Sequence, residues 1–276
     1  MYPKISLNDF TIRQAPFGDR FHIAREAGFS GIEFQVNEAR QYAKNHDGLD
    51  SVRQLLHHNN LRFDQSLMLG ECFSPSHREE RKKFLENARG LFRDTTHLGG
   101  KIVLACPTFG QADIREAPGM FAELCDLAHS FGLNLALEFM AWAETIKDIR
   151  TASVIVEKAG RKNGGMLYDT LHHHFGGSCL RDLEELPSEY LFAVHIADAQ
   201  DLNLHPIEIG RKHRLFPGEG IIPILEILYI LRAKEQDFSI ALEIFNDEYL
   251  TRPALEVARE GFESMARILS EAGFDS

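Results

Sequence analysis

The sequence predicts a single-domain α/β protein with the (β/α)8 TIM-barrel fold, and three observations lead to this prediction. The chain has 276 residues, which suits one large domain. Eight short β-rich runs recur along it, most of them nearly continuously apolar, as in parallel strands covered on both faces. Longer stretches of helical character separate these runs, and several end on glycine. A doubly wound open sheet is the alternative. No linker rich in Pro, Gly or Ser divides residues 1–276, so we expect one domain.

The elements follow in the order that a barrel requires. The predicted helices include residues 19–29, which end near Gly28, residues 79–100, which end in two glycines, and residues 117–133. The stretch between Asp198 and Ile222 looks irregular, and we expect an extended loop after the seventh strand, on the catalytic face. The eight predicted strands are residues 4–10 (KISLNDF), 31–36 (GIEFQV), 61–68 (LRFDQSLM), 101–107 (KIVLACP), 134–140 (NLALEFM), 165–171 (GMLYDTL), 191–198 (LFAVHIAD) and 239–245 (SIALEIF).

The composition of the chain limits the kinds of molecule that the protein is expected to bind. The formal net charge is -11 and no block of basic residues is present, which disfavours nucleic acid and anionic membrane surfaces. No run approaches the roughly 18 apolar residues of a membrane span, and the N-terminus lacks the apolar core of a signal peptide. Cys72, Cys106, Cys125 and Cys179 form no CxxC pair and are expected to be buried free thiols. We therefore expect a cytoplasmic protein, and a homo-oligomer stays open.

Polar residues lie near the C-terminal ends of the last four predicted strands. They are Glu138, Asp169, His195 and Glu243, with Asp198 just beyond the seventh strand. Each has a structural interpretation alone, such as an ion-paired carboxylate, a hydrogen-bonded core histidine or a helix cap. In a barrel, however, these strand ends converge on one place. Three carboxylates and one imidazole there suit Mn²⁺ or Mg²⁺, and can also take Co²⁺, Fe²⁺ or Zn²⁺.

Two further residues are candidates for binding substrate. His172 follows Asp169 by three residues and could face the same cavity, so we interpret it as a substrate ligand rather than as an additional metal ligand. His173 should point elsewhere, solvated or packed, and His174 is undecided. Arg214, in the loop HRLFPGEG, could hold substrate oxygens, or it could pair with a surface acid. No basic or glycine-rich phosphate cradle is evident, which favours an unphosphorylated substrate.

These motifs together resemble the xylose isomerase-like TIM-barrel superfamily of sugar isomerases, epimerases and dehydratases. Within it, the sequence is most similar to the inosose isomerases of inositol catabolism. The similarity lies in the sixth-strand pattern of Asp, an aromatic or Leu-like position and then His-rich residues, in the Pro-Gly turn before Gly220 and in the acidic segment NDEYLTRPALEVA after the last strand. The matching pieces cover mainly the C-terminal half and are ALEF with Glu138, YDTLH with Asp169 and His172, VHIAD with His195, RLFPGEG with Arg214 and ALEIF with Glu243, preceded by GIEF with Glu33.

The resemblance implies that Glu138, Asp169, His195 and Glu243 bind one divalent metal ion, and that His172 and Arg214 contact a small polyhydroxy ketone. It implies an isomerase or epimerase of a keto-sugar or inosose, with Glu138 and Glu243 as candidate acid–base groups in proton transfer through a metal-stabilised enediolate.

Three alternatives accompany this interpretation. The first is a dehydratase of an inosose or a dehydroshikimate-like substrate on the same site. The second is a sugar-binding barrel without catalysis, against which the intact ligand set argues. The third is the apurinic-site endonuclease of this superfamily, which uses three zinc ions and extra histidines on strands two to four. SLMLGE and VLACPT carry no histidine here, and the acidic charge agrees, so we reject the nuclease.

Overall fold

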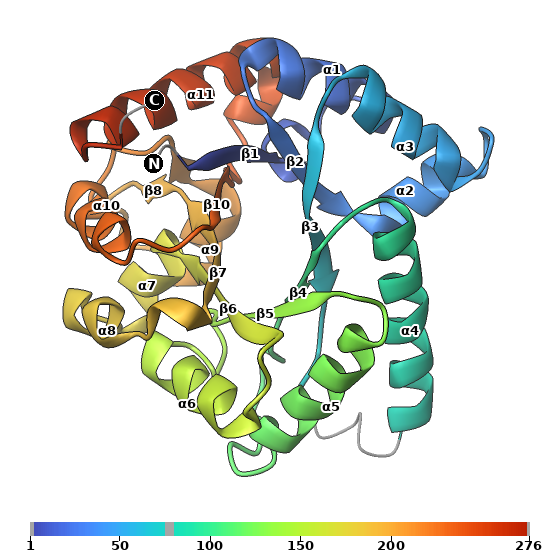
Figure 1. Cartoon of the computed structure of the whole chain (residues 1–276). Helices are drawn as coiled ribbons and strands as arrows, with labels where there is room; N and C mark the ends of the chain where they lie inside the picture. The colour runs from blue at the N-terminus through green and yellow to red at the C-terminus, as the bar shows by residue number, and fades with distance from the viewer. Residues whose placement is uncertain (1–2, 75–79, 275–276) are drawn as a thin grey trace.

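Eight parallel strands close into a barrel, with helices arranged around the outside (Figure 1). This is seen in the computed structural model, which describes residues 3–74 and 80–274. The strand order around the barrel is β1-β10-β7-β6-β5-β4-β3-β2, so the predicted (β/α)8 fold is confirmed. The barrel strands are β1 (Lys4–Asn8), β2 (Gly31–Gln35), β3 (Arg62–Leu69), β4 (Ile102–Ala105), β5 (Asn134–Glu138), β6 (Gly164–Asp169), β7 (Leu191–Ile196) and β10 (Ser239–Leu242).

The helices that cover the barrel begin close to where the sequence predicts them. The first predicted helix runs instead over Phe17–Ala27, because Pro16 precedes it and Gly28, at φ 112°, ends it in a left-handed conformation. The second begins at Arg81, and Glu79 lies outside the described residues. The outer helices are α1 (Phe17–Ala27), α2 (Val36–Ala43), α3 (Leu49–His58), α4 (Arg81–His97), α5 (Ala117–His129), α6 (Ile149–Ala159), α7 (Thr170–Gly176), α8 (Leu180–Glu185), α10 (Ile224–Ala233) and α11 (Ala254–Glu271), with short 3-10 turns at Asp9–Ile12, Ser188–Tyr190 and Tyr249–Thr251.

The period-two alternation of each strand separates two kinds of side chain. One set faces the helices and joins the large apolar core, as Leu137, Tyr168 and Val194 do. The alternate positions face the barrel axis and form a second, smaller apolar cluster that includes Ala136, Leu167 and Ala193. The next inward position along each of these strands is Glu138, Asp169 and His195, respectively, so the alternation itself directs the polar residues to one end of the barrel interior.

The stretch after β7 is more ordered than the sequence suggests, and the prediction of an irregular loop is wrong in this respect. It contains β8 (Asp198–Ala199), which pairs antiparallel with β9 (Arg214–Leu215), and the short helix α9 (Pro206–Lys212) between them. The buried carboxylate of Asp198 organises it by accepting hydrogen bonds from the backbone N–H groups of Ala199, Gly218, Gly220 and Ile222, at 2.8–3.1 Å. Asp198 therefore supports this segment and does not join the polar cluster.

The structure also bears on the expectations for the cysteines and for membrane-spanning helices. Cys72, Cys106 and Cys125 are buried free thiols, as expected. Cys179 precedes α8 and is exposed, so the expectation of a buried thiol is wrong for this residue. Across residues 3–74 and 80–274, no helix has both the length and the apolar character that crossing a membrane would require.

Candidate metal centre

The four strand-end residues meet at the C-terminal end of the barrel. Glu138 ends β5, Asp169 ends β6 and lies opposite His195 of β7, and Glu243 directly follows β10. Each offers one ligand atom, and these four atoms lie within 4.8 Å of one another. All four side chains are buried. Three carboxylates this close in a buried site repel one another unless a cation lies among them.

His195 is held in the orientation that a metal ligand needs. Its Nε2 lies 2.8 Å from Oε2 of Glu33 and 3.2 Å from the amide nitrogen of Gln65, both buried in the barrel interior. Its Nδ1 faces Glu243 at 3.4 Å and Glu138 at 3.9 Å, and has no hydrogen-bond partner among the described residues. A ring nitrogen left free beside carboxylates, with the other nitrogen bound to a carboxylate, is the arrangement of metal-bound histidines. The residues therefore fit a divalent cation.

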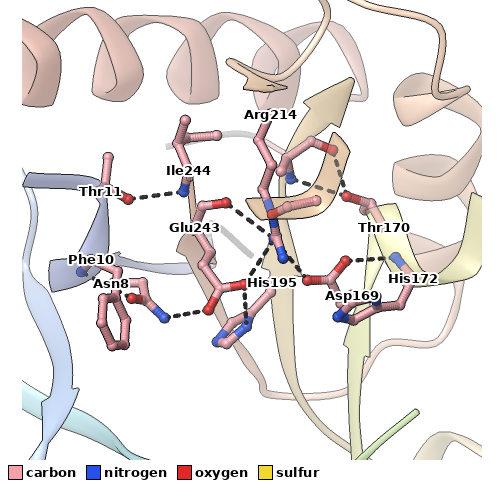
Figure 2. Close-up of polar contacts among 12 residues, drawn as sticks. Asn8, Phe10, Thr11, Asp169, Thr170, His172, His195, Arg214, Glu243 and Ile244 are labelled. Carbon is pink, nitrogen blue, oxygen red and sulfur yellow. Dashed lines mark hydrogen bonds and ion pairs between the residues drawn. The ribbon is translucent and has the colours of Figure 1, made fainter. Parts of the chain in front are cut away.

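Glu243 and Asp169 are joined by the guanidinium of Arg214, which enters from β9 between them (Figure 2). Nη1 of Arg214 donates to Oε2 of Glu243 at 2.8 Å and to Oδ2 of Asp169 at 3.1 Å. The amide of Asn8, at the end of β1, donates to the other oxygen of Glu243 at 2.8 Å. Glu243 is thus fixed through both oxygens. Arg214 is only 2% exposed and lines the cavity, so the structure places it beside the cluster and not among surface acids.

His172 also lines the cavity, and its contacts define which ring nitrogen carries the proton. Oδ1 of Asp169 accepts the backbone N–H of His172 at 2.9 Å, so Asp169 caps α7 as well as joining the cluster. Nδ1 of His172 accepts the N–H of Ala141 at 3.3 Å, which leaves Nε2 as the N–H, 3.9 Å from Oε1 of Glu138. His173 points away and packs against the ring of Tyr168, as predicted.

The two glutamates differ in electrostatic environment. Burial and the nearby Glu243 raise the pKa of Glu138 to about 8. For Glu243, burial would raise the pKa, but His195 and Arg214 outweigh it and lower the pKa to about 2. Burial would lower the pKa of His195, yet Glu243 and Glu33 together raise it well above its usual value. In the absence of a metal ion, protons on Glu138 and His195 add to the charge of Arg214 in offsetting the carboxylates.

A cavity of about 400 Å³ opens above the cluster. Glu138, Glu243, His172 and Arg214 form its base. Its wall is mostly apolar and aromatic, with Phe10, Leu67, Leu104, Met140, Trp142 and Phe245. The predicted metal-binding and substrate-binding residues are thereby brought into one site of ligand size.

Sequence reasoning misses the support beneath this site. It does not single out Asn8 or Gln65, it names Cys106 only as a buried thiol, and it includes Glu33 only as part of GIEF. Each is a buried polar or thiol side chain in or directly after a barrel strand, but β1 and β3 carry several other polar residues, so only Glu33 stands out in its strand. Cys106 contacts Oε2 of Glu138 at 3.4 Å through its thiol. No local pattern shows which of these residues face one another across a closed barrel.

Comparison with known proteins decides the family. The model of the xylose isomerase-like TIM barrel family matches residues 21–268. The chain belongs to this family. It is 26% identical over 255 residues to the inosose isomerase of Halalkalibacterium halodurans, with 88% of each protein covered. It is 29% identical over 247 residues to the 3-dehydroshikimate dehydratase of Pseudomonas aeruginosa, covering 87% of this chain and 38% of that protein.

Among solved structures, the chain resembles the crystal structure of the IOLI protein with a binding zinc atom. The TM-score is 0.89 and the identity 22%, with 97% of this chain and 98% of the other covered. At this identity the likeness shows a shared fold. The resemblance inferred from the motifs is confirmed for the family.

Proposed function

We propose that this protein is a divalent-metal-dependent enzyme that moves a proton at the carbon next to the carbonyl of a small hydroxyketone, as an isomerase or epimerase of a keto-sugar or inosose. The observation that carries the proposal is the free Nδ1 of His195, held by Glu33 and directed at the carboxylates of Glu138 and Glu243. The isomerase names of several relatives, such as the protein of H. halodurans, support it.

Glu138, Asp169, His195 and Glu243 are the proposed ligands of one ion. The preponderance of oxygen donors favours Mn²⁺ or Mg²⁺, whereas the zinc atom bound to the IOLI protein favours Zn²⁺. When bound, such an ion acts as a Lewis acid that polarises a carbonyl and acidifies the adjacent C–H bond.

The residues around that ion have distinct proposed roles. Both oxygens of Glu243 already accept hydrogen bonds, from Asn8 and Arg214, so this carboxylate stays anionic and fixed. Oε1 of Glu138 accepts no hydrogen bond from the described residues and faces the cavity, so Glu138 is the better placed of the two to take and return a proton. The Nε2–H of His172 points to the same region and would donate to a substrate oxygen.

A dehydratase is the second candidate function. It is favoured by the 29% identity to the 3-dehydroshikimate dehydratase of P. aeruginosa, although this chain spans 38% of that protein. The same abstraction of a proton beside a ketone leads to loss of water when a hydroxyl group lies on the next carbon and leaves with a proton.

Proton NMR in D₂O tests the proposal. The protein is loaded with Zn²⁺, or with Mn²⁺ that is then exchanged for Mg²⁺ because Mn²⁺ broadens proton spectra. Each sample is incubated with scyllo-inosose or with 3-dehydroshikimate. We expect either a new isomer that carries deuterium beside its ketone, or a dehydrated product that has lost this hydrogen together with the hydroxyl group of the next carbon, and neither product with Glu138→Gln. Binding of metal and ketone by the wild-type protein without exchange of any C–H would leave a binding protein and refute catalysis.

A further inference from the structure

The mouth of the cavity has the opposite charge from its base. The base carries the carboxylates of Glu138 and Glu243, whereas Arg13, Arg211 and Lys212 line the mouth with a single acid, Asp247. The protein as a whole has a formal charge of -11, so a cationic group of residues at this place departs from the average surface. The ion and Arg214 would balance the carboxylates of the base, which leaves the mouth with an excess of positive charge.

Two of these cations have no carboxylate of their own. Arg13 lies 4.0 Å from Asp247, the limit of an ion pair. Neither Arg211 nor Lys212 forms an ion pair with any residue that the structure describes, and both are exposed. Most of the other arginines that the structure describes, including Arg161 and Arg181, are paired with an acid.

The segment that carries Arg211 and Lys212 is held against the cavity. Nε of Arg214 donates to the carbonyl of Gly210 at 2.8 Å, and the backbone of Asp247 donates to the carbonyl of Lys212 at 3.1 Å. A Cβ at Gly210 would lie 2.6 Å from the ring of Trp142, so glycine is needed for this close approach of α9. The guanidinium of Arg211 lies 5.7 Å from the ring centre of Phe109, a cation–π distance. These contacts hold the backbone at the end of α9 against the cavity and place the guanidinium of Arg211 beside Phe109.

The wall between base and mouth offers few partners for hydroxyl groups. Leu67, Leu104, Met140 and Phe245 line it, and such side chains neither donate nor accept hydrogen bonds. An inosose has a hydroxyl group on every ring carbon except the ketone, and several of these would lose hydrogen bonds to water against this wall. A hydroxyketone with an apolar or unsaturated ring edge fits better.

We propose that the substrate carries a carboxylate at its end remote from the ketone, and that Arg211 and Lys212 bind this group. The inference rests on the proposed function for the position of the ketone at the base of the cavity, and among the hydroxyketones which that function allows it favours a carboxylated one, as in the dehydratase candidate, over an inosose. A carboxylate matches the planar fork of an arginine with an adjacent lysine. A phosphate would usually be cradled by several backbone N–H groups, whereas the C-terminal end of α9 presents backbone carbonyl groups here, so the side chains of Arg211 and Lys212 are the donors that α9 offers.

Binding of shikimate and of its methyl ester tests this directly. The two ligands differ mainly in charge, and neither carries the ketone, so neither is turned over. Trp142 is the single tryptophan of the chain and lines the cavity, so its fluorescence reports occupancy. We expect the metal-loaded protein to bind shikimate about tenfold more tightly than the ester, the effect of one charge-assisted hydrogen bond. The double variant Arg211→Gln/Lys212→Gln should lose this preference and bind the ester as before.

The variant Lys158→Gln/Lys162→Gln is the matched control, since it removes two exposed lysines at the opposite end of the barrel. It should keep the preference. Equal affinity for both ligands, no binding of shikimate, or the same loss in the control would overturn the inference. Tighter binding of fructose 6-phosphate than of shikimate would overturn the choice of carboxylate. A preserved carboxylate preference with no C–H exchange on any hydroxyketone would refute the proposed function alone, and exchange without the preference would refute this inference alone.

Discussion

Replacing Glu33 by glutamine changes the charge behind His195 while keeping the shape of the side chain. Glu33 and His195 are both 0% exposed, and Oε2 of Glu33 lies 2.8 Å from Nε2 of His195. The amide oxygen of the introduced glutamine can still accept this hydrogen bond, so the loss is the difference between a charge-assisted and a neutral bond. That difference is about 1–2 kcal/mol. It corresponds to an increase of about 5- to 30-fold in the dissociation constant of the divalent ion.

The pH dependence of this loss distinguishes an electrostatic role from a merely structural one. Glu33 also helps to raise the pKa of His195, so its removal lowers the competition between protons and the ion for Nδ1. The two effects oppose each other at low pH, and the loss of affinity in Glu33→Gln should therefore grow as the pH rises. Competition with a chromophoric chelator, from about pH 6 to about pH 9, measures this loss across the range in which a metal-binding histidine exchanges its proton.

Glu157→Gln is the matched control for this experiment, because Glu157 is exposed on the outer helix α6 and has no ion pair among the described residues. Its affinity for the ion should equal that of the wild-type protein. An unchanged affinity in Glu33→Gln with an intact fold, or a loss that does not vary with pH, would refute the reasoning.

Three other predictions concern the rest of the molecule. Burial lowers the pKa of His173 to about 4, so its contribution to stability is complete above pH 6.5 and decreases as the pH falls toward 4, by up to about 3 kcal/mol; His173→Leu should flatten this part of a denaturation-against-pH curve. Asp198→Ala leaves four backbone N–H groups without their acceptor and should lower the free energy of unfolding by about 3–5 kcal/mol in a urea titration. A thiol reagent should modify Cys179 rapidly and the three buried cysteines only after unfolding, since burial raises the pKa of Cys125 to about 12; a second fast thiol would contradict the buried positions.

The barrel and its polar centre can be predicted from the sequence because both follow from local signals. The run NLALEFM is apolar at almost every position, so Glu138 stands out, and the same contrast identifies Asp169, His195 and Glu243. Their convergence follows from parallel strands in a closed barrel, whatever the details of packing.

The contacts that support the polar centre depend on long-range distances, which no local sequence pattern encodes. The sequence places Arg214 in a loop near the substrate, but its bonds to Asp169 and Glu243 arise only because β9 pairs with β8 and directs it inward. Asp198 looks like one more polar residue at a strand end, yet it organises the loop from beneath. The pairing of Glu33 with His195 joins residues 162 positions apart across the barrel.

The most direct test of the account is the metal content of the protein after equilibrium dialysis, measured together with proton release on metal binding. The account predicts one divalent ion per chain, and a loss of bound ion in His195→Leu, whose side chain offers no ligand atom. Because the pKa of His195 is raised and that of Glu138 is about 8, binding near pH 7 should release between about one and two protons, visible as a buffer-dependent heat in calorimetry. Full metal content in His195→Leu, or binding without proton release, would contradict the proposed centre.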